Sequence, residues 1–229
     1  MGWWMDRISA ANVIKIKDIY KVSTFVETGT FRGVNLKFWA SYFNNVIGCE
    51  LNTEYYAITK DRLDHTYNKI NYQLINKSSP EFLSEYAAQY KQDKRTDYVL
   101  FYLDAHFYDS ALTNKFVVLD ELKALKGMTK AIIVIHDFDV SGLGYIEYDG
   151  QPLNFDLVKD ALREVNPEFD YYRNTRERSD VHNLDSIKYC FGLDADADTI
   201  ETINYHQEDR LKHRGILYCL PRLYDLERL

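Results

Sequence analysis

Apolar residues along the chain follow two alternating patterns. Short runs without charge, such as Tyr98 to Leu103 and Ala131 to Ile135, are typical of strands buried on both faces of a parallel sheet. Between such runs, apolar residues recur every three or four positions, which is typical of helices with one buried face. The alternation predicts an α/β fold built from βαβ units, with helices covering a parallel sheet.

The two patterns divide the chain into separate elements. Helices are predicted at Asp6 to Tyr20, Val34 to Phe43, Thr53 to Leu63, Pro80 to Tyr90 (with Ser79 as the cap), Asn114 to Lys126 and Phe155 to Val165. Strands are predicted at Lys21 to Val26, Val46 to Cys49, Tyr72 to Ile75, Tyr98 to Leu103, Ala131 to Ile135, Phe169 to Arg173, Ile187 to Phe191 and Ile216 to Leu220. The segment Tyr145 to Pro152 is predicted to be a loop.

Length, charge and cysteine content narrow the class of protein. At 229 residues the chain is long enough for one α/β domain, predicted to span residues 1–229 with residues 1–20 as a leading helical segment. A net charge of -7 argues against a nucleic-acid partner. Cys49, Cys190 and Cys219 show no C-x-x-C spacing, which favours free thiols in a reducing compartment. Because no apolar run reaches the length of a membrane span, we expect a cytoplasmic protein without a membrane partner.

A glycine turn joins the first predicted strand to its helix. The segment Glu27-Thr28-Gly29-Thr30-Phe31-Arg32-Gly33 contains two glycines, which allow a sharp turn and a close approach of backbone to ligand. Strand, turn and helix N-terminus together are typical of a nucleotide-binding element, although two glycines can also form a plain turn. The pattern lacks the second glycine of G-x-G-x-x-G, so it favours a nucleoside without a diphosphate.

Four acidic residues follow predicted strands of the sheet. Because ligands of open α/β sheets bind beyond the carboxyl ends of the strands, these four side chains are expected to line one crevice. Glu50 lies roughly 20 residues past the glycine turn, where dinucleotide folds accept ribose hydroxyls. Singly, each residue could instead cap the next helix. The four are Glu27, Glu50, Asp104 and Asp137.

These segments carry a resemblance to a known family. Together with Leu103-Asp104-Ala105-His106-Phe107-Tyr108 and Ile135-His136-Asp137, they resemble class I S-adenosylmethionine-dependent methyltransferases over about Lys21 to Phe138. The likeness is to the branch with Asp-x-His after strand four and His-Asp after strand five. It implies a Rossmann-like three-layer sandwich, with a mostly parallel sheet of about seven strands and an antiparallel C-terminal strand. It also implies S-adenosylmethionine as the cofactor, bound by Glu27, Thr28, Gly29, Thr30, Gly33, Glu50, Ser78 and Asp104.

The motifs after strands four and five indicate the chemistry. His106 and Asp104 are the predicted catalytic residues, with the His106 imidazole as the base that removes a proton from an acceptor hydroxyl. Asp104 and Asp137 could hold a divalent cation such as Mg²⁺ through oxygen ligands, as the resemblance suggests for some relatives. The metal pair and His106 acting alone remain alternatives. His136 is expected to face the core, because neighbouring strand residues point to opposite sides.

The leading functional hypothesis is methyl transfer from S-adenosylmethionine to a hydroxyl of a small polar molecule, with a sugar among the candidates. A nicotinamide-dependent oxidoreductase would share the fold, but should show G-x-G-x-x-G. A non-catalytic nucleoside-binding module is the third hypothesis. The sequence carries no signal for the acceptor or for the oligomeric state.

Overall fold

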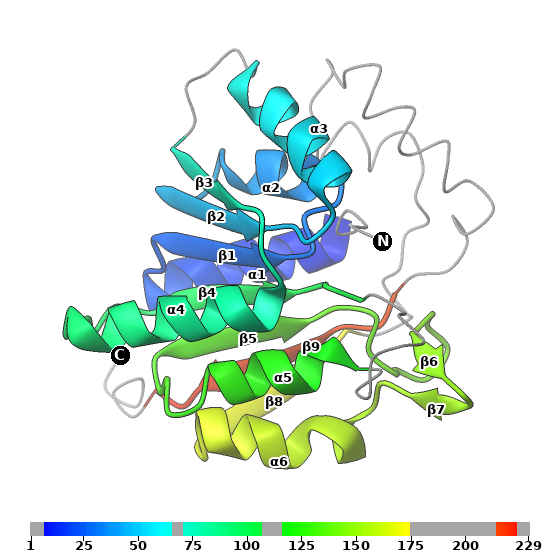
Figure 1. Cartoon of the computed structure of the whole chain (residues 1–229). Coiled ribbons are helices and arrows are strands. Elements are labelled where there is room, and N and C mark those ends of the chain that lie inside the picture. Colours follow the sequence, from blue (N-terminus) through cyan, green and yellow to red (C-terminus); the bar gives the residue numbers. More distant parts are fainter. Residues whose placement is uncertain (1–6, 66–70, 107–115, 175–213, 224–229) are drawn as a thin grey trace.

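Seven strands form one sheet, which Figure 1 shows with helices in front of it and behind it. The computed structural model describes residues 7–65, 71–106, 116–174 and 214–223. The strand order is β3-β2-β1-β4-β5-β9-β8, and all neighbouring pairs are parallel except those that include β9. This confirms the predicted mostly parallel sheet with an antiparallel C-terminal strand. The strands are β1 (Thr24–Thr28), β2 (Asn45–Cys49), β3 (Tyr72–Ile75), β4 (Val99–Leu103), β5 (Ala131–Ile135), β8 (Phe169–Arg173) and β9 (Leu217–Pro221).

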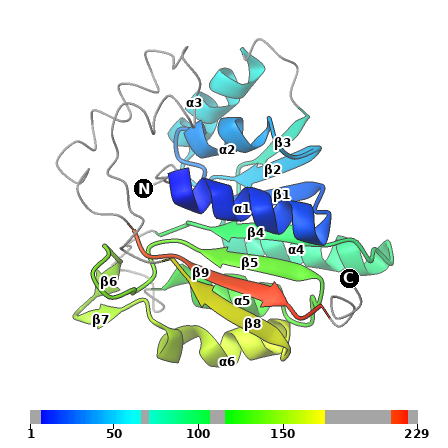
Figure 2. The same ribbon diagram turned by 180° about the vertical axis from the view of Figure 1, so that it is seen from behind.

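Helices cover both faces of the sheet, as the views in Figures 1 and 2 show. One face carries α1 (Arg7–Tyr20), α2 (Val34–Trp39) and α3 (Thr53–Asp64), and the other carries α4 (Ser79–Gln92), α5 (Val117–Ala124) and α6 (Phe155–Val165). Successive strand residues alternate between two apolar cores. Phe101 and Ile133 pack under α4, α5 and α6, whereas Leu100 and Ile132 pack on the opposite face. The three-layer sandwich is therefore confirmed.

Several helix boundaries differ from the sequence prediction: α3 ends at Asp64 rather than Leu63, α4 at Gln92 rather than Tyr90 and α5 at Ala124 rather than Lys126, and two further differences have a clear cause. The cap of α4 is Ser78 rather than Ser79, because Pro80 is tolerated at the second helical position as well as at the first. Helix α2 ends at Trp39 rather than Phe43, because the next backbone N–H groups bond three residues back in tighter turns. Neither difference moves a strand.

The first strand and one connection also differ. Lys21 turns the chain out of α1 with a φ of 54°, so β1 begins at Thr24, and Glu27 is one of its last two residues. The predicted loop contains a short hairpin of β6 (Glu147–Tyr148) and β7 (Gln151–Pro152). Its turn is Asp-Gly with positive φ at both residues, a hairpin signal that the sequence reading missed.

Other predictions are resolved only in part. The antiparallel pair consists of β8 and β9, while the predicted strand Ile187 to Phe191 lies outside the described residues, as does Cys190. Cys49 and Cys219 are buried free thiols, as predicted. None of the helices in the described ranges combines the length and the apolar character that crossing a membrane requires. That residues 1–229 form a single domain stays a prediction.

The turn between β1 and α2 lies very close to the end of β4. Gly29 has a φ of 70°, and a Cβ atom there would lie 2.8 Å from the Cα atom of Ala105. The N–H groups of Gly29 and Thr30 both donate to the carbonyl oxygen of Cys49, at 3.0 and 3.2 Å, which ties the turn to β2. The turn therefore has no room for a side chain at Gly29.

We expect Gly29→Ala to reduce the free energy of unfolding more than Gly150→Ala does. Both glycines have left-handed backbones, with φ of 70° and 75°, so both variants carry a similar strain of about 1–2 kcal/mol. Only the first variant must also displace the Ala105 backbone, because nothing lies within 4 Å of a Cβ at Gly150. Chemical denaturation measures both changes, and equal destabilisation would contradict this close approach.

A carboxyl group is buried beneath this edge of the sheet. Glu121 on α5 is 1% exposed, and burial raises its pKa to about 7 despite side-chain hydrogen bonds with Ser79 and Thr28 that lower it. The ordinary value is 4.5, so the unfolded chain ionises at lower pH than the folded protein does. Stability therefore falls as the pH rises from about 4.5 to about 7.

Glu121→Gln should remove this contribution, which amounts to about 3 kcal/mol at 1.36 kcal/mol per pKa unit. The variant should gain stability relative to the wild type as the pH rises through that window. Asp120→Asn on the same helix, where the side chain is 39% exposed and paired with Lys123, serves as the control. Urea titrations at several pH values measure the effect. A constant difference between Glu121→Gln and wild type would contradict the raised pKa.

Candidate functional site

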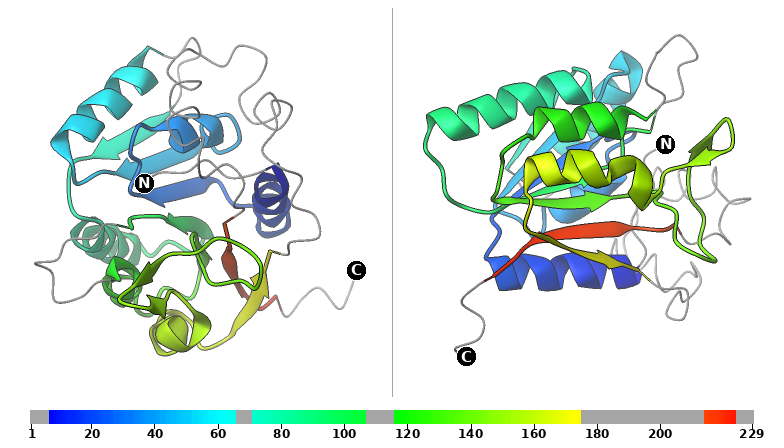
Figure 3. Two further views of the ribbon diagram at one scale, coloured as in Figure 1. Left: turned by 90° about the vertical axis from the view of Figure 1, so that its right-hand side faces the viewer. Right: turned by 90° about the horizontal axis from the view of Figure 1, so that it is seen from below.

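The predicted site residues gather at the carboxyl edge of the parallel strands. Figure 3 (left) looks onto this edge, where the β6–β7 hairpin also stands. The residues come from five neighbouring strands, so the sheet topology brings them together as predicted. They are Glu27, Thr28, Gly29, Thr30 and Gly33 in and after β1, Glu50 after β2, Ser78 after β3, Asp104 and His106 after β4, and Asp137 after β5.

Glu50 links the glycine turn to the start of α3. Its side chain is mostly buried, with Oε2 accepting from the N–H of Phe31 at 2.8 Å and Oε1 accepting from the N–H of Asn52 at 2.9 Å. Each carboxylate oxygen has a second lone pair, so each can still accept a hydrogen bond from a ligand. Glu50 therefore supports the turn as well as offering a place for ribose hydroxyls.

Glu27 is a buried carboxyl group with one unsatisfied oxygen. Its Oε1 accepts from the Asn35 amide at 2.5 Å, and its Oε2 has no hydrogen-bond partner among the described residues. Burial raises its pKa well above the ordinary range, and the nearby carboxylates of Asp104 and Glu50 raise it further against the lowering effect of Asn35. This carboxyl group can ionise readily only if a cationic partner approaches it.

Further polar atoms at this edge are buried without a hydrogen-bond partner within the described part of the chain. They include the hydroxyl of Thr30, the Nε atom of Arg32 and the Oδ2 atom of Asp104. The Oδ1 atom of Asp137 also accepts no hydrogen bond there, although His136 and Arg214 approach it in ion pairs. Thr28, by contrast, is engaged, because its hydroxyl accepts from the N–H of Asp104 at 3.2 Å and so joins β1 to β4. Unsatisfied buried acceptors are uncommon in folded proteins and here point to a ligand that donates hydrogen bonds.

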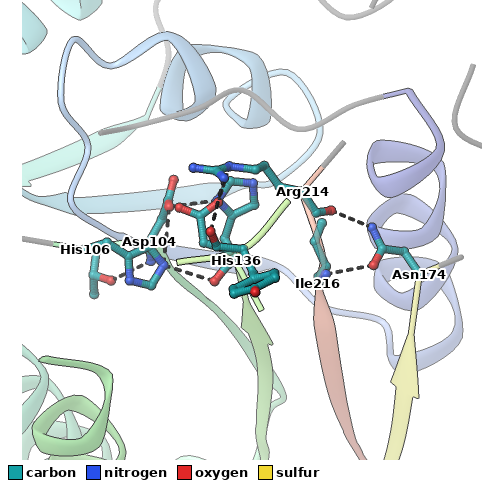
Figure 4. Close-up of polar contacts among 9 residues, drawn as sticks. Asp104, His106, His136, Asn174, Arg214 and Ile216 are labelled. Carbon is teal, nitrogen blue, oxygen red and sulfur yellow. Dashed lines mark hydrogen bonds and ion pairs between the residues drawn. The ribbon is translucent and has the colours of Figure 1, made fainter. Parts of the chain in front are cut away.

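Two histidines and two aspartates form an ionic cluster at the ends of β4 and β5 (Figure 4). The Nδ1 atom of His136 lies 2.9 Å from Asp104 Oδ1 and 3.3 Å from Asp137 Oδ1. His136 is buried, 2% exposed, with its ring beside Tyr102 of the core, as expected. Its Nδ1 nevertheless reaches both carboxylates, because the chain turns at Asp137, which has a φ of 57°. Arg214 completes the cluster, with Nε 2.8 Å from Asp137 Oδ1 in an ion pair.

His106 is held by the backbone of His136. Its Nε2 lies 3.0 Å from the His136 carbonyl oxygen, so Nε2 carries the proton and donates it. In the neutral ring, Nδ1 then keeps a lone pair. Burial lowers the pKa of His106, while the carboxylates of Asp137 and Asp104 act in the opposite direction. His106 is therefore a neutral imidazole that can accept a proton at Nδ1.

The site also contains potential ligand atoms for a metal ion. Asp104, His136 and Asp137 each offer one such atom, and these atoms lie within 4.8 Å of one another. The arrangement does not fit a resident Mg²⁺ ion, which takes oxygen ligands in octahedral geometry, because His136 and Arg214 already supply cationic partners to the carboxylates. Metal binding at Asp104 and Asp137 stays a prediction from the sequence.

Sequence reasoning missed Arg214 and Asn174, which approach the cluster from the C-terminal strands. The sequence did carry a signal for Arg214. The residues just before an antiparallel strand lie at the same edge as those just after parallel strands, and Arg214 precedes the antiparallel β9. Asn35, which binds Glu27 from α2, carried no comparable signal.

Comparisons with known proteins bear on the fold of the chain. No family model matches the chain, and no curated protein matches it in sequence. Solved structures do match, and the three described next are each 10% identical to this chain. Human methyltransferase-like protein 13 in complex with SAH has a TM-score of 0.53 and shares 95% of this chain and 81% of its own. The O-methyltransferase from Bacillus cereus in complex with SAH has a TM-score of 0.50, over 94% of this chain and 82% of its own. A SAM-dependent methyltransferase from Anabaena variabilis has a TM-score of 0.50, over 95% and 84%. The chain therefore has the fold of the class I S-adenosylmethionine-dependent methyltransferases.

Proposed function

We propose that this chain transfers the methyl group of S-adenosylmethionine to a hydroxyl of a small polar acceptor. One observation carries the proposal. On a methyltransferase sheet, Glu50 and the glycine turn lie at the ends of β1 and β2, and a neutral buried imidazole, His106, follows the adjacent strand β4. A nucleoside-binding half and a proton-accepting half are therefore neighbours along one edge.

The residues present fit S-adenosylmethionine. Glu50 retains acceptor capacity for the two ribose hydroxyls, while Glu27 Oε2 and Asp104 Oδ2 are buried acceptors without partners in the described ranges. A ligand with a positive charge would let the carboxyl group of Glu27 ionise at less cost. Bound S-adenosylmethionine supplies such charge, together with a methyl group made electrophilic by its positively charged sulfur.

His106 is the proposed general base for the transfer. Bound S-adenosylmethionine would donate its methyl group to the acceptor oxygen and keep the C–S electron pair on sulfur, while Nδ1 of His106 would take the hydroxyl proton. The His136 carbonyl oxygen supports this role, because it holds the proton of His106 at Nε2. Asp104 acts beside it by accepting from the His136 Nδ1–H at 2.9 Å.

The acceptor class is argued from charge. Carboxylates at this edge accept hydrogen bonds from hydroxyl groups, which suits a sugar or another hydroxyl-rich small molecule. The net charge of -7 disfavours a nucleic-acid acceptor. The name of the Bacillus cereus structure, an O-methyltransferase, is consistent with a hydroxyl acceptor.

Two measurements separate this proposal from its alternatives. Calorimetric titration with S-adenosylmethionine and with NAD distinguishes a methyltransferase from a nicotinamide-dependent oxidoreductase. Formation of S-adenosylhomocysteine with a panel of sugars and phenols then distinguishes an enzyme from a non-catalytic nucleoside-binding module. Binding of NAD in preference to S-adenosylmethionine would overturn the proposal.

Glu50→Gln should weaken binding of S-adenosylmethionine by at least about tenfold, because hydrogen bonds to a charged group are worth about 1.5–3 kcal/mol. The variant keeps one oxygen acceptor for the backbone N–H groups of Phe31 and Asn52, so only part of the turn's support is lost. Glu54→Gln, an exposed substitution in the first turn of α3, is the matched control. Calorimetry measures both affinities, and unchanged affinity in Glu50→Gln would remove this residue from the nucleoside site.

The rate of transfer should rise with pH and level off below pH 6.5. The reason is that burial lowers the pKa of His106 from its ordinary value of 6.5, so the neutral base is already formed at neutral pH. His106→Gln, which keeps an N–H donor for the His136 carbonyl, should reduce kcat by about 10²–10⁴-fold and spare cofactor affinity. His65→Gln at an exposed position is the control. A variant that retains the wild-type rate and pH profile would exclude His106 as the base.

A further inference from the structure

We propose that the guanidinium of Arg214 takes the place of a metal ion at the ends of β4 and β5, so that Asp104 and Asp137 bind no divalent cation. The consequence that methyl transfer needs no metal rests on the proposed function. The absence of a metal site is independent of the proposed function, and metal-binding measurements test it without an activity assay.

The carboxylates of Asp104 and Asp137 require cationic partners, supplied either by the protein or by a bound metal ion. Asp104 is 0% exposed and Asp137 is 2% exposed. Burying an ionised carboxylate without compensation costs several kcal/mol. Asp137 also has a left-handed backbone with a φ of 57°, a conformation that costs a non-glycine residue about 1–3 kcal/mol. The fold thus tolerates strain to bring this carboxylate into the cluster.

Side chains of the protein supply the compensating charge. Nδ1 of His136 lies between the two carboxylates, at 2.9 Å from Asp104 and 3.3 Å from Asp137, and Arg214 Nε lies 2.8 Å from Asp137. Burial lowers the pKa of His136, but both carboxylates raise it, and the outcome is above its ordinary value. With His136 protonated, which its raised pKa favours, two carboxylates, one imidazolium and one guanidinium leave the cluster without net charge.

A divalent cation would have to displace these partners. A metal bound to His136 through Nδ1 would need the lone pair of that atom, yet Nδ1 faces carboxylate oxygens and therefore carries a proton. A dication on Asp137 would also lie beside a guanidinium, which does not lose its proton in proteins. Both contacts make metal binding at this cluster unfavourable.

Arg214 is fixed in position by the backbone around it. The amide of Asn174 donates to the Arg214 carbonyl oxygen at 2.8 Å and accepts from the N–H of Ile216 at 2.7 Å (Figure 4). Between these two, Gly215 accepts from the N–H of Phe138 at 2.8 Å. A Cβ atom at Gly215 would lie only 1.9 Å from the Phe138 carbonyl oxygen. The segment before β9 is thus fitted against the residue that follows Asp137.

Arg214 is accordingly a positioning residue. It holds Asp137, which holds the imidazole of His136, and the His136 carbonyl oxygen holds Nε2 of His106. The charge of Arg214, and not only its bulk, should determine the stability of the protein and its affinity for Mn²⁺. A purely structural role would depend on bulk alone.

The test uses Mn²⁺ titrations and thermal unfolding of the full chain in wild type, Arg214→Lys and Arg214→Met. We expect no saturable Mn²⁺ binding up to millimolar concentration in wild type or Arg214→Lys, which keeps the charge. Arg214→Met should unfold at a lower temperature and should bind Mn²⁺ at least about tenfold more tightly, because its carboxylates lack a cation. Arg222→Met is the control, because the ion pair of Arg222 with Asp170 is exposed. It should change neither the unfolding temperature nor the affinity for Mn²⁺.

If Arg214→Met fails to fold, the double variant with Asp137→Asn removes both charges and should recover stability without gaining Mn²⁺ binding. Two results would overturn the proposal. One is saturable Mn²⁺ binding by the wild type that Asp137→Asn abolishes, and the other is an Arg214→Met protein as stable as wild type that still binds no Mn²⁺. Chelator-insensitive methyl transfer is expected as well, whereas a protein without any transfer activity would count only against the proposed function.

Discussion

Electrostatic repulsion among buried carboxyl groups at one edge of the sheet constrains the rest of this structure. Parallel strands bring Glu27, Glu50, Asp104 and Asp137 to the same edge, three of them almost fully buried. Each is stabilised in a different way. Backbone N–H groups donate hydrogen bonds to Glu50. The Asn35 amide donates to Glu27, and the raised pKa of Glu27 favours its uncharged form. Cationic side chains neutralise the two aspartates. These differences divide the edge into parts with different chemistry.

The division explains how one edge can serve two purposes. At β1 and β2, carboxyl groups keep unsatisfied or spare acceptor capacity, which suits a ligand with hydroxyls and positive charge. At β4 and β5 the charges are balanced internally, so the groups there can orient a neutral imidazole rather than bind an ion. Thr28, bonded to the N–H of Asp104, joins the two parts.

The sequence predicted the sheet because most of its strands are charge-free runs, and it placed the four acids because they lie at or just after the ends of strands. It did not predict Arg214, whose part in the site depends on the direction of β9 and on the register of β9 against β5. It also did not predict that the buried His136 contacts both aspartates, since strand alternation stops where Asp137 adopts a positive φ. Boundaries such as Ser78 were off by one residue, because capping and first-turn positions tolerate the same residue types.

The most direct test of this account is a crystal structure of the protein grown with S-adenosylhomocysteine and MnCl₂, with anomalous scattering recorded for manganese. The account predicts the ribose hydroxyls against Glu50 and no manganese between Asp104 and Asp137, where His136 and Arg214 should remain bound to the carboxylates. A nucleoside bound away from Glu50, or a manganese peak on the two aspartates with Arg214 displaced, would contradict it.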